Sequence, residues 1–273
     1  MLTKLLKYEF RSIGRQLIPL YLGVLGLAVV NHFFWFTRSD YDIYLPDGLG
    51  SIPAVATMMA YVAVMVALGV ITLLLIIQRF YKGLLTEEGY LMFTLPCKPW
   101  QLIAAKGITA SAMTIVGSAV GMLSIMLMGM ELSDWGGIFQ MFGKIPWGEL
   151  FRQHALWPLY IPEGLALLLV GVFASIGHIY VSIAIGHLFH KHRVAWSIGA
   201  YIGINILQSV LMSVFFQIMN RFDWHWMNRL FENIAPAWRA HIIMLVLIAC
   251  AAIPAAIFFF GTDWILKNKL NLE

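Results

Sequence analysis

The chain has 273 residues, of which 60% are hydrophobic and only 12% are charged, and its formal net charge is +4. Soluble domains contain about 25% charged residues, so this composition excludes an ordinary water-soluble enzyme and predicts a membrane protein. The small positive charge is typical of a protein held at an anionic inner membrane surface, and it gives no indication of nucleic-acid binding.

Residues 1–16 combine apolar and basic side chains at helical spacing. The apolar positions are Leu2, Leu5, Leu6, Phe10 and Ile13, and the basic ones are Lys4, Lys7, Arg11 and Arg15. This pattern predicts an interfacial amphipathic helix that leads into the membrane. The alternative is a basic flank that only fixes the topology.

Six stretches without any Lys, Arg, Asp or Glu follow along the chain. They are residues 17–36, 54–77, 107–130, 164–189, 194–219 and 242–261. A helix of about 20 residues crosses a hydrocarbon core of roughly 30 Å. The stretches are apolar on every face, whereas the strands of a membrane barrel alternate polar and apolar residues. We therefore predict an all-α polytopic membrane protein, a single transmembrane domain over residues 1–273 with six transmembrane helices.

The distribution of charge between the stretches predicts the orientation. Twelve Lys and Arg residues lie at the two termini and in the second and fourth loops, against six in the other three loops, which also hold nine of the 14 acidic residues. The positive-inside rule then places both termini in the cytoplasm. The outer loops, 131–163 and 220–241, are rich in aromatic residues, which is typical of segments at the level of the lipid headgroups.

The spans lack the ionisable groups that ion-coupled transporters use. No predicted span contains a carboxylate, Lys or Arg, and His178 is the one ionisable residue well inside a span. For a lone His in a membrane, hydrogen-bonded packing is a more ordinary role than proton relay. His187, His190 and His192 lie beside basic residues at a span end, and we interpret them as a solvated flank rather than a metal site.

Sequence motifs for catalysis are also missing. The chain has no H-E-x-x-H, no G-x-S-x-G and no phosphate-binding G-x-x-x-x-G-K-[ST] pattern. We therefore expect no catalytic residue, metal or cofactor in this chain. If it moves a substrate uphill, another subunit must hydrolyse the nucleotide.

Residues 78–106 form the most distinctive cytoplasmic segment. Thr86 can cap the N-terminus of a short helix. The negative side chains of Glu87 and Glu88 in its first turn would then interact favourably with the helix dipole. Tyr90, Leu91, Phe93 and Leu95 would then form an apolar surface, and Pro96 would end the helix. Such an acidic and aromatic helix is a candidate docking element. The alternative is a connector with its aromatic side chains in the headgroups.

This segment carries a family resemblance. Glu88–Pro96 reads E-G-Y-L-M-F-T-L-P and is followed by Gln101, Leu102 and Lys106. It resembles the permease subunits of bacterial ABC transporters of the ABC-2 (type V exporter) class, and Leu5–Arg11 is similar to that family's N-terminal helix. Lys98 departs from the pattern, because relatives often have a small helix-capping residue there.

The resemblance implies a multi-pass protein of the bacterial cytoplasmic membrane, an ATP-driven exporter with two ATPase subunits that hold ATP and Mg, and a second permease, identical or homologous. The membrane lipid is its other expected partner. The implied coupling helix comprises Leu85, Thr86, Glu87, Glu88, Gly89, Tyr90, Leu91, Phe93 and Leu95. The alternatives are a stand-alone carrier or channel and an intramembrane enzyme, and the substrate can be a peptide, an antibiotic, a lipid or an ion.

Two spans contain polar stripes that the resemblance places near the permease–permease interface and the exit path. The stripe residues are Tyr61, Met65 and Thr72 on the second span, and Tyr201, Asn205 and Gln208 on the fifth. Hydrogen bonds that only pack helices are the alternative role. Gly117-x-x-x-Gly121 and Ala195-x-x-x-Gly199-x-x-x-Gly203 allow close helix approach.

Overall fold

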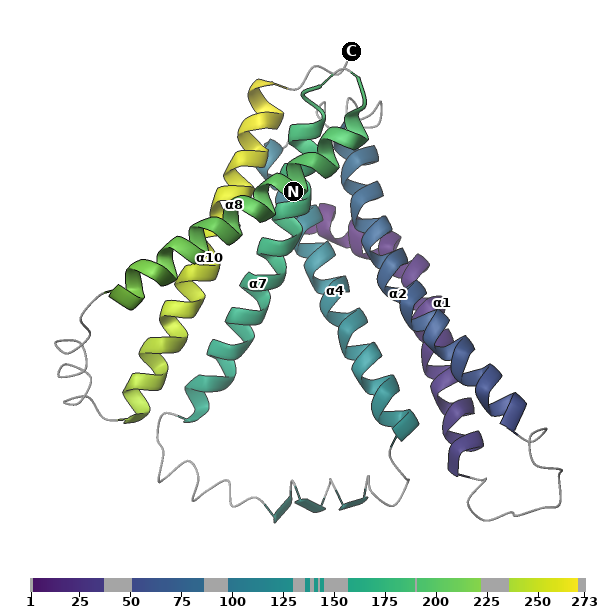
Figure 1. The fold of residues 1–273 in the computed structure, drawn as a ribbon. Helices are drawn as coiled ribbons and strands as arrows, with labels where there is room; N and C mark the ends of the chain where they lie inside the picture. The colour runs from purple at the N-terminus through teal and green to yellow at the C-terminus, as the bar shows by residue number, and fades with distance from the viewer. Residues whose placement is uncertain are drawn as a thin grey trace, which may run out of the picture. The chain divides into compact units, whose positions relative to one another are not determined.

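The computed structural model describes residues 2–36, 51–85, 98–129, 157–189, 191–221 and 236–269, with a few short pieces between 136 and 144. Its long helices are α1 (Leu2–Phe36), α2 (Ser51–Leu85), α4 (Pro99–Gly129), α7 (Trp157–Gly186), α8 (Arg193–Arg221) and α10 (Pro236–Asn268) (Figure 1). Within these described ranges, six helices are long and apolar enough to cross a membrane. This confirms the all-α prediction and its six candidate spans, and it describes a multi-pass membrane protein.

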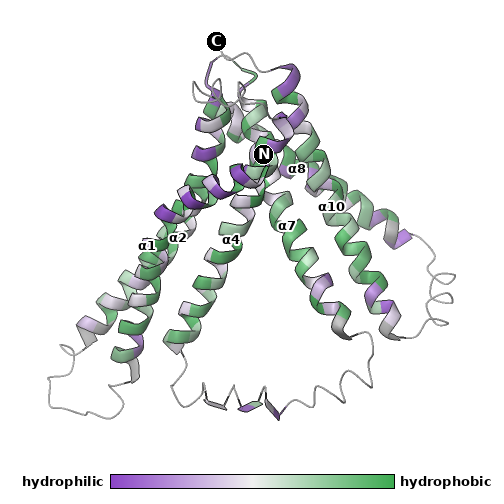
Figure 2. Cartoon of the chain, turned by 180° about the vertical axis from the view of Figure 1, so that it is seen from behind, coloured by the Kyte–Doolittle hydropathy of each residue, from purple (hydrophilic) through white to green (hydrophobic). Residues whose placement is uncertain are grey.

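The helices are longer than the charge-free stretches. α1 and α2 each have 35 residues, or about 50 Å at 1.5 Å per residue, against a hydrocarbon core of roughly 30 Å. Hydrophobic residues fill most of each helix, and hydrophilic ones gather toward the ends (Figure 2). α7, by contrast, stops at Gly186, three residues before the end of its charge-free stretch, and residues 187–188 form a turn.

Residues 2–16 do not form a separate helix. α1 runs unbroken from Leu2 through Pro19 to Phe36, so the amphipathic segment and the first span are one element. The four basic residues of this segment, Lys4, Lys7, Arg11 and Arg15, are exposed. Its location at the membrane surface stays a prediction.

The chain forms two compact units. One comprises Met1–Gln78 and Ile108–Pro146, and the other comprises Arg79–Gly107 and Trp147–Glu273. Because α2 and α4 are each divided between the units, residues 79–85 and 99–107 belong to the unit that contains α7, α8 and α10.

In the first unit, α1, α2 and α4 pack through small residues and through long-range hydrogen bonds. A Cβ atom at Gly117 would lie 3.4 Å from the Tyr21 hydroxyl, and one at Gly121 would lie 3.5 Å from the Met65 side chain. The Tyr21 hydroxyl donates to the Met113 carbonyl at 3.1 Å. The first small-residue motif thus brings α4 close to α1 and α2, as predicted. The buried core of this unit includes Leu17, Val24, Ala28, Tyr61 and Leu68.

In the second unit, α7 packs against both α10 and α8. A core of Val181, Ala184, Phe258 and Ile265 joins α7 to α10. The connection from α7 to α8 is short, and His192 adopts a left-handed conformation with φ of 58° just before α8 begins. The aromatic rings of Phe189 and Trp196 stack across this connection at 4.2 Å.

Gly186 is required at this connection, because a Cβ atom there would lie 2.7 Å from the Cα atom of Ser197. Backbone cannot yield as a flexible side chain can, so we expect Gly186→Ala to destabilise the protein by about 1–3 kcal/mol through overpacking. Gly171 in the same helix has nothing within 4 Å of its added Cβ. Gly171→Ala should be neutral or stabilising by up to about 1 kcal/mol. Thermal unfolding of the two purified variants tests this, and equal melting temperatures would contradict it.

Candidate functional site

The coupling segment predicted from the sequence is only partly described. Leu85 is the last residue of α2 and is buried. Thr86, Glu87, Glu88, Gly89, Tyr90, Leu91, Phe93 and Leu95 lie outside the described residues. The structure does describe the helix ends on both sides of this segment, residues 79–85 of α2 and 99–107 of α4, and we call these two helix ends the base.

That base is among the most densely packed parts of the second unit. Phe80 and Leu84 near the end of α2 are completely buried, and Leu102 and Ile103 at the start of α4 are 2% exposed. From the sequence, residues 78–106 were predicted to lie wholly in the cytoplasm. Instead, the helix ends continue into a buried core.

Lys106 illustrates this difference. It was counted among the cytoplasmic charges, yet it lies inside α4 and is only 5% exposed. Its ammonium group occupies the space beside Gly83 of α2, where an added Cβ atom would lie 2.6 Å from Nζ. Because Gly83 has no side chain, the end of α2 can pack closely against Lys106 at the start of α4.

Two aromatic stacks connect the end of α2 to α7. The rings of Phe80 and Tyr180 are nearly parallel, with centroids 4.0 Å apart, and those of Tyr81 and His187 are 5.5 Å apart. His187 lies just beyond the end of α7, where burial and the nearby Arg193 guanidinium lower its pKa. The imidazole is consequently neutral near pH 7, which suits a stacked position.

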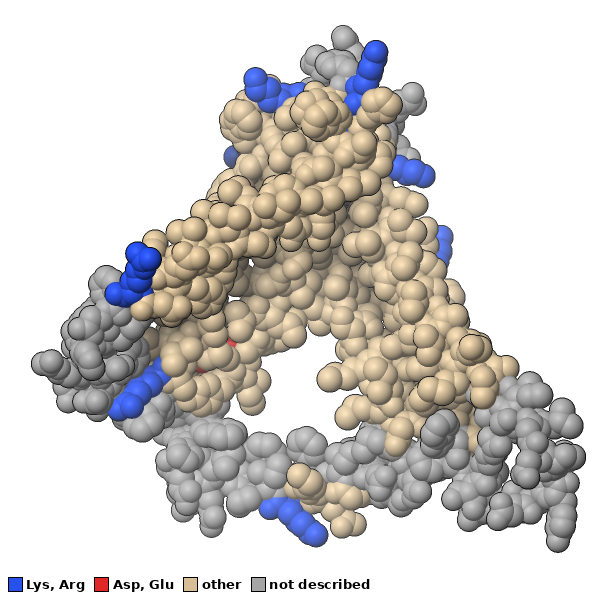
Figure 3. Space-filling model, in the orientation of Figure 1, with Lys and Arg blue, Asp and Glu red and all other residues tan. Residues whose placement is uncertain are grey.

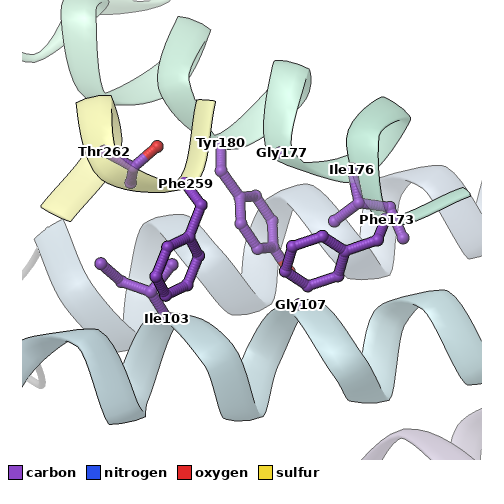
Figure 4. Close-up of a pocket in the computed structure, with 8 residues that line it drawn as sticks. All are labelled: Ile103, Gly107, Phe173, Ile176, Gly177, Tyr180, Phe259 and Thr262. Carbon is purple, nitrogen blue, oxygen red and sulfur yellow. The ribbon is translucent and has the colours of Figure 1, made fainter. Parts of the chain in front are cut away.

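A small apolar pocket lies beside these stacks. Figure 4 shows Ile103 and Gly107 of α4 facing three rings, those of Phe173 and Tyr180 from α7 and Phe259 from α10. Ile176, Gly177 and Thr262 complete the lining. The pocket is a junction of three helices, with no charged residue in its wall.

The predicted stripe on the second span is directed into helix packing. Tyr61 is buried, with its hydroxyl 2.9 Å from the Ser124 hydroxyl of α4, and Met65 contacts the same residue. Thr72 is also buried and donates to the Leu68 carbonyl of its own helix at 2.7 Å. These contacts correspond to the packing role.

The predicted stripe on the fifth span is open. Tyr201 and Asn205 are exposed and Gln208 is half-buried, and the Asn205 amide donates to the Tyr201 carbonyl within the helix. The Tyr201 ring stacks on His178 of α7, with centroids 4.5 Å apart. A role at an interface or path stays a prediction for this stripe.

His178 has a packing environment. It is 7% exposed, and its ring lies against Tyr201 of α8 and Phe258 of α10. This sandwich of three rings joins three helices in the second unit. The packing part of the expected role is thus seen, while His178 Nε2 has no hydrogen-bond partner within the described residues.

The sequence reasoning missed an ionisable pair between α7 and α10. His241 Nδ1 lies 2.9 Å from both carboxylate oxygens of Glu163, and the side chains are 3% and 14% exposed. An ionised carboxylate can only accept a hydrogen bond, so Nδ1 is the donor when Glu163 is ionised. Tyr160 stacks on the imidazole at 4.2 Å. Both residues lie within candidate spans.

Another carboxylate lies near the C-terminal end of α10. Asp263 is 9% exposed and pairs with Lys267 one turn along the helix. The expectation was that no predicted span contains a carboxylate, Lys or Arg. It held for the charge-free stretches, but the helices continue beyond them and include Lys106, Glu163 and Asp263.

The surface of the described helices otherwise fits a lipid environment. Long stretches of the visible face carry no Lys, Arg, Asp or Glu (Figure 3). Within the described part of the chain, no three His, Cys, Asp or Glu side chains come close enough to hold a metal ion.

Comparisons with protein-family models, with curated proteins and with solved structures gave no match to this chain.

Proposed function

We propose that this chain is the membrane-spanning permease subunit of an ATP-driven exporter in the bacterial cytoplasmic membrane. The observation that carries the proposal is the E-G-Y-L-M-F-T-L-P segment between the second and third of six candidate spans. Its likeness to the ABC-2 class supports a role in contacting an ATPase. Since the chain has no phosphate-binding motif of its own, ATP and Mg belong to a separate subunit.

The packing around the segment supports this role. A docking element has to pass a displacement to the membrane helices, and a loop on mobile flanks would absorb that displacement instead. Here the helix ends on both sides, Arg79–Leu85 and Pro99–Gly107, belong to one compact unit with α7, α8 and α10. A displacement of the segment by a bound ATPase would therefore be passed to this compact unit.

The open face of α8 supports a second permease as partner. Added Cβ atoms at Gly199 and Gly203 would meet nothing within 4 Å, and Asn205 is exposed one half-turn further on. An amide that faces lipid is unfavourable, and small residues let a second helix approach closely. An identical or homologous permease packed on this face would cover the amide.

A stand-alone proton-coupled carrier is the second candidate function. The buried Glu163–His241 pair favours it, because ionisable groups within membrane helices often bind the coupling ion. The two functions differ in one requirement. The carrier would move a substrate uphill without any other protein, whereas the permease needs an ATPase.

Purification tests the proposal. The isolated chain should hydrolyse no ATP, and the chain extracted from its native membrane in mild detergent should retain an ATPase subunit. The measurements are phosphate release and identification of the retained proteins. Robust hydrolysis by a verified single-chain preparation would contradict the proposal, and so would complete absence of a nucleotide-binding partner.

A further inference from the structure

We propose that Tyr180 is the positioning residue through which movement at the end of α2 reaches α7, by way of its ring stack on Phe80. This inference rests on the proposed function, because it describes how an ATPase-driven displacement would enter the membrane helices. It adds a specific connection that the sequence did not indicate.

The stack is buried and close to planar. Phe80 is 0% exposed and Tyr180 is 2% exposed, and their rings are inclined by only 14° at a centroid distance of 4.0 Å. Two flat rings in this arrangement cannot move apart without opening a void in a close-packed interior. A shift of Phe80 therefore displaces Tyr180.

A second ring contact between α2 and the end of α7 restricts how the two helix ends can move relative to each other. Tyr81, the next residue on α2, stacks on His187 two turns further along the chain from Tyr180. Two adjacent residues of α2 thus hold α7 and the turn after it at two levels. A rotation of the end of α2 would consequently turn the corresponding end of α7 with it.

The start of α4 strengthens the same base. Lys106 fills the space beside Gly83, and an added Cβ atom at Gly107 would lie 2.9 Å from the Phe173 ring of α7. The two helix ends that flank residues 86–97 therefore contact each other, and each contacts α7. α7 in turn packs on α8 and α10, so a displacement of this base that moves α7 would reach both of these helices.

A reporter at the opposite end of α7 can test this connection. Ile161 is 74% exposed near the start of α7, so a cysteine there can carry an environment-sensitive fluorophore. Cys97 and Cys250 are first replaced by Ser. In the complex with its ATPase, trapping with ADP and vanadate should change the fluorescence of this label.

Tyr180→Phe keeps the ring and should retain the signal. Tyr180→Leu keeps an apolar side chain but removes the stack, and it should lose the signal while the ATPase still copurifies and hydrolyses ATP. Phe80→Leu tests the same stack from the other side and should give the same loss. This second variant decides the question if Tyr180→Leu does not fold.

The outcomes separate the two proposals. A full fluorescence change in Tyr180→Leu or Phe80→Leu, with the ATPase bound, would overturn this inference and leave the proposed function intact. Failure of the unmodified chain to retain any ATPase would overturn both. Loss of the signal in the Leu variants, with retention in Tyr180→Phe, would support both.

Discussion

Replacing Glu163 by Leu should lower the stability of the protein by about 3–5 kcal/mol, because it leaves the His241 ring buried without its partner. Only 3% of the His241 side chain is exposed, and its Nδ1 makes both of its hydrogen bonds to Glu163. A loss of this size corresponds to a fall in melting temperature on the order of 10 °C. Thermal unfolding of the purified protein in detergent measures it.

The double variant Glu163→Leu, His241→Leu is the matched control. Replacing both members of a buried ion pair by apolar residues is often neutral or stabilising, because no unpaired polar group remains. The double variant should therefore melt closer to the unmodified protein than either single variant does. A loss in the double variant equal to the sum of the losses in the two single variants would show that the pair is not coupled.

Replacing Tyr90 and Leu91 together by Asp should weaken association with the ATPase by roughly 30- to 1,000-fold, or about 2–4 kcal/mol. The reason is that charges would then face an apolar contact on the partner. Expression and membrane insertion should persist, since these residues lie outside the predicted spans. Copurification of the ATPase and ATP-dependent export are the measurements.

The variant Tyr90→Phe, Leu91→Met provides the control for this change. It preserves the apolar character and approximate volume of both side chains, so binding of the ATPase should be retained. Unchanged copurification of the ATPase with the Asp variant would mean that the segment is only a connector between two spans.

The helices could be predicted from the sequence because a membrane imposes one strong requirement. An uncharged stretch of about 20 residues that is apolar on all faces has few alternatives to a spanning helix. The same rule misplaced the helix ends. It took the first charged residue as the boundary, whereas Glu163 and Asp263 lie inside helices with their charges paired.

The pair of Glu163 and His241 could not be found from the sequence. The two residues are 78 positions apart, and each was assigned to the edge of an outer loop. Only the packing of α7 on α10 brings them together. A useful signal was nevertheless present, because each lies next to a predicted span and has an aromatic residue three positions before it, Tyr160 and Trp238.

The aromatic stacks at the base of the coupling segment could not be predicted from the sequence for a different reason. Phe80, Tyr81 and Tyr180 are ordinary aromatic residues of membrane helices, and nothing in their spacing links α2 to α7. By contrast, the docking residues around Tyr90 were inferred from the sequence alone, and they lie outside the described residues. The proposed docking surface thus comes from the sequence, and the proposed connection from α2 to α7 comes from the structure.

The most direct test of the permease assignment is the native mass of the complex released from its own membrane in mild detergent. We predict two permease chains, at least one of them this 30.8 kDa chain, together with two copies of a nucleotide-binding ATPase subunit. A complex that contains only copies of this chain, and that still moves its substrate uphill, would contradict the account.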